Sequence, residues 1–119
     1  MLEDNVRFWQ LLDHLINDSK IVIDRPKGSR HPRFHETVYP LDYGYLNRTT
    51  SSDDEAIDVF IGSNAVKKLT AVIITVNIMK KDSEIKLLLG CSKEEGKTAL
   101  DFCNQADNMQ EILVSRKYK

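Results

Sequence analysis

The sequence predicts a mainly β fold of the α+β kind, a small β-barrel or curled sheet with helices packed outside it. Several dense apolar runs read as strands and are not separated by regular helical crossovers, and helical spacing is confined to two segments. The 119 residues are 41% hydrophobic and 29% charged, which supplies apolar side chains for one core. A single domain over residues 1–119 is therefore expected.

The first element is an amphipathic helix within residues 1–18. Apolar side chains recur at three- and four-residue steps up to Asn17, and Asp4 is a suitable N-cap. A short β-branched strand follows at residues 20–24 and stops at Pro26, because proline fixes φ and lacks an N–H. The next irregular stretch, up to residue 52, is long enough to indicate a functional surface.

The core of the barrel is expected over residues 20–91. Three more strands are predicted in dense runs of branched apolar residues, at residues 56–61, 69–79 and 85–89.

The chain after the core contains the second helix and the last strand. Ser92 and Glu95 have capping-box spacing, which predicts a helix over residues 92–105. A break at residues 106–108 and a last strand at residues 110–116 follow.

The charge balance and the cysteines exclude several classes of function. The 17 Lys+Arg and 18 Asp+Glu leave a formal charge of -1, so neither nucleic acid nor a membrane surface is an expected partner. Cys91 and Cys103 lack CxxC spacing, which fits neither a zinc ribbon nor a dithiol redox site. The chain has no secretory signal and no run long enough to span a bilayer, so we expect a cytoplasmic location.

Two acidic groups are candidates for metal binding. Carboxylates at alternate positions of an extended chain point the same way, and Mg²⁺ and Mn²⁺ prefer oxygen ligands. An EF-hand does not fit, because its glycine and its terminal glutamate are missing at the required offsets. A two-metal pocket is one interpretation, and solvated turns are the other. The first group is Asp53, Asp54, Glu55 and Asp58, and the second is Asp82 and Glu84, followed by Lys86.

Basic and tyrosine side chains mix in the irregular stretch, at Arg25, Lys27, Arg30, Arg33 and Arg48 and at Tyr39, Tyr43 and Tyr45. Such a surface suits a phosphorylated small molecule or a single-stranded nucleic acid, or is a solvated loop. The nearby carboxylates favour the small molecule, because they would repel a polyanion but would bind the metal of a metal-phosphate complex.

Three segments in order resemble motifs of the soluble family I inorganic pyrophosphatases. Residues 23–29 (IDRPKGS), 38–45 (VYPLDYGY) and 53–59 (DDEAIDV) match that family's acidic residue before I-P-K-G-S, its Y-P-x-N-Y-G and its D-G-D-P-x-D-V. The resemblance covers residues 21–89, because Asp82, Glu84 and Lys86 echo in shortened form a later D-x-x-x-x-D-x-K motif of the family. It implies a five-stranded OB-like β-barrel that hydrolyses pyrophosphate to two phosphates with a water activated by Mg²⁺, or alternatively Mn²⁺. It also suggests a homo-oligomer.

The resemblance implies a role for each matching residue. Metal ligands would be Asp53, Glu55, Asp58, Asp82 and Glu84. Glu55 and Asp58 would be catalytic, with Glu55 at the position that helps to deprotonate the attacking water. Substrate would be bound by Asp24, Arg30, Arg33, Tyr43 and Lys86, where Arg30 substitutes for an arginine on a hairpin that this chain lacks.

Two alternatives to pyrophosphate hydrolysis remain. The missing hairpin would open the pocket to a nucleotide or another phosphoanhydride, which would make the chain a hydrolase of a larger substrate. A non-catalytic barrel that binds a phosphorylated ligand or a single strand is the other alternative. The retained carboxylates oppose this second alternative, because close like charges are costly in a pure binding protein.

Overall fold

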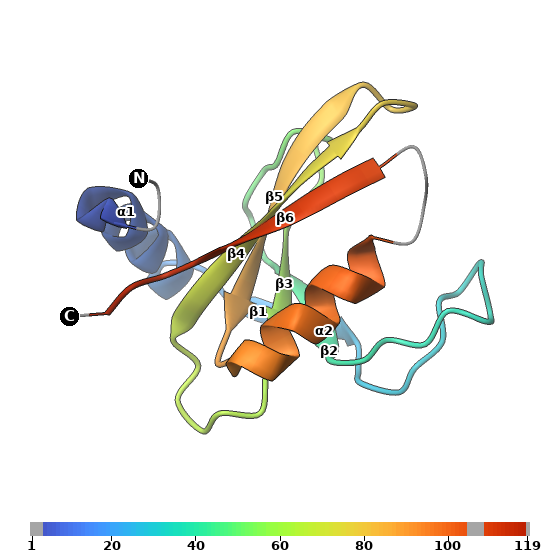
Figure 1. The fold of residues 1–119 in the computed structure, drawn as a ribbon, viewed down its shortest axis with the longest axis horizontal. Coiled ribbons are helices and arrows are strands. Elements are labelled where there is room, and N and C mark those ends of the chain that lie inside the picture. Colours follow the sequence, from blue (N-terminus) through green and yellow to red (C-terminus); the bar gives the residue numbers. More distant parts are fainter. Residues whose placement is uncertain (1–3, 105–108, 119) are drawn as a thin grey trace.

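The computed structural model describes residues 4–104 and 109–118. Figure 1 shows a twisted sheet with α1 beside one end and α2 lying across one face. The elements are α1 (Val6–Asn17), β1 (Ile21–Arg25), β2 (Asp42–Leu46), β3 (Ile57–Ile61), β4 (Leu69–Asn77), β5 (Asp82–Leu89), α2 (Lys93–Cys103) and β6 (Met109–Ser115). The predicted mainly β class, with an N-terminal helix and one later helix, is confirmed.

The strands form one sheet in the order β1-β2-β3-β5-β4-β6. All neighbours are antiparallel except β3 and β5, which pair in parallel. Over the described parts of the chain β1 and β6 do not pair, so the sheet is unclosed.

The sheet has six strands and not the five expected. The additional strand is β2, in the stretch that the sequence presents as irregular. Its residues do not alternate between apolar and polar, and Gly44 lies at its centre. A Cβ at Gly44 would lie 1.8 Å from the Val22 carbonyl oxygen, so the glycine permits the close pairing of β1 with β2.

Apolar side chains are buried on both faces of the sheet. Consecutive residues on β3, Val59 and Phe60, belong to different clusters, and so do Leu87 and Leu88 on β5. Adjacent side chains of a strand point to opposite faces, so these continuous apolar runs indicate a sheet covered on both sides. Trp9 of α1 packs into one cluster and Ala99 of α2 into the other.

The capping residues predicted from the sequence are confirmed at α2, whereas the predicted N-cap of α1 is wrong. The Ser92 and Glu95 capping box is present, and α2 ends at its C-cap Asn104. At α1 the N-cap is Asn5, whose side chain accepts from Phe8 N, and not Asp4 as predicted. Asp4 instead forms an ion pair with Lys117 at 3.1 Å. The break predicted at residues 106–108 lies outside the described residues.

Neither described helix is long and apolar enough to cross a membrane. Cys91 and Cys103 are free thiols. Burial raises the pKa of Cys91 to about 12, because an apolar environment disfavours the thiolate.

Candidate functional site

An open cavity of about 660 Å³ lies where β1, β2 and the start of β3 meet two loops. Its lining is strongly polar and contains carboxylates, tyrosines and two cations. The lining residues are Asp24, Arg25, Tyr43, Gly44, Tyr45, Asp53, Glu55, Ala56, Asp58 and Lys80. Five of the site residues that the family resemblance implies therefore share one cavity: Asp24, Tyr43, Asp53, Glu55 and Asp58.

Tyr43 and Asp58 are held together by the pairing of β2 with β3. The ring of Tyr43 packs edge-on against Phe60 with centroids 4.8 Å apart, and its hydroxyl donates to Asp58. Burial and the Asp58 carboxylate raise the pKa of Tyr43, so the phenol stays protonated. Tyr43 thus presents a fixed hydrogen-bond donor beside a carboxylate.

Lys86 reaches Asp58 from the neighbouring strand, because β3 and β5 pair with Asp58 opposite Lys86. The Lys86 Nζ lies 3.6 Å from Asp58 Oδ2 and 3.5 Å from Glu84 Oε2. The side chains of Lys86 and Glu84 are only 13% and 12% exposed, so little water screens this contact. The ammonium group therefore balances two carboxylates at the base of the site.

The turn before β3 fixes Asp53 in its charged form. Its Oδ1 accepts from Ser51 Oγ at 2.7 Å and from Glu55 N at 2.9 Å. The Ser51 hydrogen bond lowers the pKa of Asp53 to about 2, while burial and contact with Asp53 raise the pKa of Glu84. Asp53 therefore ionises more readily than Glu84 where these two side chains meet.

The donor set suits a hard divalent cation. Asp53, Glu55 and Asp58 offer carboxylate oxygens to the same cavity, and the buried Glu84 Oε1 has no hydrogen-bond partner. No three His, Cys, Asp or Glu side chains within residues 4–104 and 109–118 are already grouped around a single ion position. Lys86 adds an ammonium group beside Asp58 and Glu84.

The remaining predicted residues lie in three places. Glu84 and Lys86 are on β5, where Lys86 contacts Asp58 and Glu84 contacts Asp53. Asp82 is at the start of β5, opposite Asn77, and does not line the cavity. Asp82 and Glu84 are two residues apart on β5, so their side chains lie on the same face of the strand.

Arg30 and Arg33 do not line the carboxylate cavity. They belong to a segment that Figure 1 shows projecting from the sheet between β1 and β2. Backbone hydrogen bonds between Gly28 and Tyr39 and between Ser29 and Tyr39 close this segment on itself. Arg30 Nη1 donates to the His35 carbonyl at 2.7 Å, so its guanidinium holds the segment's own backbone.

Arg25 and Lys80 are cavity cations outside the set implied by the resemblance, although the sequence analysis placed Arg25 in the basic surface that suits a phosphorylated ligand. The register of β1 shifts between Ile23 and Arg25, so Asp24 and Arg25 both line the cavity, although neighbours on a regular strand point apart. Arg25 also donates to the Tyr39 hydroxyl. A bulge has no signature in this sequence, and neither does the placement of Lys80 in a lysine-rich turn.

Comparison with known proteins points to one family. The family model for Inorganic Pyrophosphatase matches residues 12–112, which includes every candidate site residue. The crystal structure of an inorganic pyrophosphatase from Neisseria gonorrhoeae is similar at 15% identity, with a TM-score of 0.58, over 76% of this chain and 77% of that chain. An inorganic pyrophosphatase from Helicobacter pylori is similar at 16% identity, with a TM-score of 0.54, over 80% and 81%. No curated protein matches significantly.

Proposed function

Because the chain belongs to the inorganic pyrophosphatase family, we propose that it hydrolyses pyrophosphate to two phosphates with Mg²⁺ as the required ion. The observation that carries the proposal is the cavity in which Asp53, Glu55 and Asp58 lie beside Arg25 and Lys80. Carboxylates suit the metal ions that accompany a phosphoanhydride, and cations suit its oxygens. The family and the fold both support this class of reaction.

Phosphoryl transfer depends mainly on positioning and on charge neutralisation. Asp53, Glu55 and Asp58 would hold Mg²⁺, with Glu84 and Asp82 nearby for further ions, and the bound ion would supply charge neutralisation and a water of lowered pKa. Arg25 and Lys80 would bind phosphate oxygens.

The remaining roles concern protons and orientation. Glu55, exposed on the cavity wall, would accept the proton of the attacking water. The protonated Tyr43 would keep Asp58 oriented or donate to a substrate oxygen. Lys86 would hold Asp58 and Glu84 in place until substrate and ion bind.

Phosphate release from pyrophosphate tests the proposal, first with Mg²⁺ and then with Mn²⁺. The Asp58→Ala variant is the site variant, and Asp101→Ala removes an exposed carboxylate on α2, away from the cavity. We expect release by the native chain and by Asp101→Ala, and a loss of about 10²-fold or more in Asp58→Ala. Equal activity of Asp58→Ala and the native chain would remove the site assignment.

The size of the cavity supports a second substrate class. At about 660 Å³ the open cavity has room for more than pyrophosphate, and Tyr45 adds an aromatic surface for a base. Nucleoside di- and triphosphates therefore belong in the same assay. Phosphate release from the nucleotides alone would identify a nucleotide phosphoanhydride hydrolase. Release from neither the nucleotides nor pyrophosphate would favour a non-catalytic protein that binds a phosphorylated ligand.

The proposal includes a cytoplasmic homo-oligomer with a single domain over residues 1–119. Two free cysteines suit a reducing compartment, and the uncovered edges of β1 and β6 suit pairing with a copy. Size measurement by sedimentation tests the oligomer directly.

A further inference from the structure

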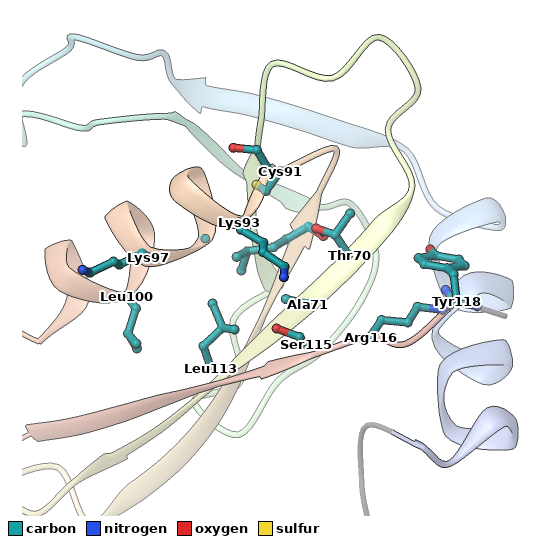
Figure 2. A pocket seen from close by; sticks show the side chains of 13 residues that line it. Thr70, Ala71, Cys91, Lys93, Lys97, Leu100, Leu113, Ser115, Arg116 and Tyr118 are labelled. Carbon is teal, nitrogen blue, oxygen red and sulfur yellow. The ribbon is translucent and has the colours of Figure 1, made fainter.

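A separate cavity of about 450 Å³ lies between α2 and the strands β4 and β6. In Figure 2, Lys97 and Leu100 on α2 mark one side of it, and Arg116 and Tyr118 mark the opposite side beside α1. None of its lining residues lines the carboxylate cavity. Its volume falls in the range of about 300–1,000 Å³ that small-molecule sites occupy.

The interior of this cavity is apolar. Ala71 and Leu88 are buried at its floor, and Leu100 and Leu113 form its walls. Gly96 brings α2 close to the sheet, because a Cβ there would already lie 3.3 Å from Leu113 Cδ1. The helix α2 therefore bounds one side of the cavity, and the interior suits an apolar group of a ligand.

The rim is cationic and has no acidic residue among the lining side chains. Lys93 and Lys97 lie one turn apart on α2, are exposed, and form no ion pair within the described residues. A like-charged pair at this spacing destabilises a helix slightly, and a lysine in the first turn also opposes the helix dipole. Both costs would be offset by an anion bound at the rim.

Arg116 is a weaker candidate for anion binding than the two lysines. Its guanidinium already makes a bidentate contact with Asp13, so part of its charge is neutralised. Lys93 and Lys97 are therefore the lining cations that form no ion pair within residues 4–104 and 109–118.

We propose that this cavity binds a free medium-chain aliphatic carboxylate. The chain lies on Ala71, Leu88 and Leu113, and the carboxylate is bound by the Lys93 and Lys97 ammonium groups. A phosphoanhydride does not fit here, because the apolar interior would remove its hydration without replacing the hydrogen bonds. The site is thus distinct in both position and chemistry from the carboxylate cavity.

Octanoate is the probe, and its binding is measured by titration calorimetry and by NMR of the α2 and β6 amides. Octanamide keeps the apolar body without the charge, and acetate keeps the charge without the body. We expect saturable octanoate binding with shifts confined to α2 and β6, affinity about tenfold lower for octanamide, and no saturation with acetate. Absence of saturable octanoate binding, or equal affinity for octanamide, overturns the proposal.

The site variant is Lys93→Glu with Lys97→Glu, and the matched control is Lys20→Glu with Lys27→Glu. All four lysines are exposed, and glutamate in the first turn of α2 complements the helix dipole, so the site variant should fold. We expect octanoate affinity to fall about tenfold in the site variant only. Equal affinity in both variants contradicts the proposal.

A second copy of the chain is the competing occupant of the cavity. Sedimentation distinguishes a second copy from a carboxylate ligand. If the native chain is a dimer and the site variant is a monomer, a copy covers the cavity and the proposal is overturned. Binding is measured without pyrophosphate, so failure here is independent of the outcome of the hydrolysis assay.

Discussion

Arg116 binds Asp13 through two parallel hydrogen bonds, 2.7 Å from Nη1 to Oδ1 and 2.8 Å from Nη2 to Oδ2. The contact joins the segment after β6 to α1, near the two ends of the chain. Asp13 holds the pKa of Arg116 above its usual value, and the guanidinium also lies 4.4 Å from the centre of the Tyr118 ring. This pair therefore fixes α1 against the sheet.

Replacing Arg116 by lysine should lower the free energy of unfolding by about 1 kcal/mol, because lysine cannot make the planar two-bonded contact. Urea denaturation measures the change. The exposed pair Lys117 and Asp4 supplies the control, since Lys117→Ala should change stability by less than about 0.5 kcal/mol. An equal loss of unfolding free energy in Arg116→Lys and Lys117→Ala would mean that the bidentate geometry adds no stability.

Removing the Tyr43 hydroxyl should impair catalysis more than folding. In Tyr43→Phe the ring still packs on Phe60, but Asp58 loses its donor. We expect kcat/KM for pyrophosphate to fall about tenfold while the free energy of unfolding falls by less than about 1 kcal/mol. Tyr118→Phe, which loses hydrogen bonds with Leu69 O and Arg116 far from the carboxylate cavity, should keep full activity.

Glu95 should make α2 sensitive to acid. Burial acts to raise its pKa, but hydrogen bonds from Ser92 and Ser63 lower it below its ordinary value of 4.5. A lowered folded pKa gives stability that is present above 4.5 and is lost as pH falls through the folded value. Glu95→Gln should therefore lose less stability than the native chain between about pH 5 and pH 3.

Thermal unfolding across that pH range measures the acid effect of Glu95. Glu94→Gln is the matched control, because Glu94 is the exposed neighbour on the same helical turn. The stability of Glu94→Gln should depend on pH as that of the native chain does. The same pH dependence in Glu95→Gln would contradict the role of Glu95 in acid sensitivity.

Adding a methyl group at Gly44 should separate β1 from β2. The new Cβ would lie 1.8 Å from Val22 O, a backbone atom that moves only with its strand. We expect Gly44→Ala to cost about 2 kcal/mol or more and to abolish hydrolysis, because Gly44 lines the cavity. Gly28→Ala, at φ +86° but in open space, should cost only about 1 kcal/mol by urea denaturation.

The sequence predicted those elements whose signal is local. Ser92 and Glu95 predicted the start of α2 because a capping box needs only four residues. The dense apolar runs predicted β3, β4 and β5, since buried strands need no polar alternation. The grouping of Asp53 with Asp58 followed from their closeness in the chain.

The parts that sequence reasoning missed depend on distant contacts. The strand β2 forms because β1 and β3 pair with both of its edges, although Tyr43, Gly44 and Tyr45 show no amphipathic pattern. Arg25 enters the cavity through a shift in strand register. Arg30 was expected at the substrate but is held by the backbone of its own segment.

The parallel pairing of β3 with β5 determines when the site can form during folding. The pairs β1-β2, β2-β3 and β4-β5 are antiparallel and join strands that follow one another in sequence, whereas the join between β3 and β5 must pass over β4. Contacts between distant residues form slowly, because the loop must close before the contact stabilises it. Asp58 and Lys86 face each other across this join. A refolding chain should therefore form the short β2-β3 and β4-β5 hairpins before it recovers the ability to hydrolyse pyrophosphate.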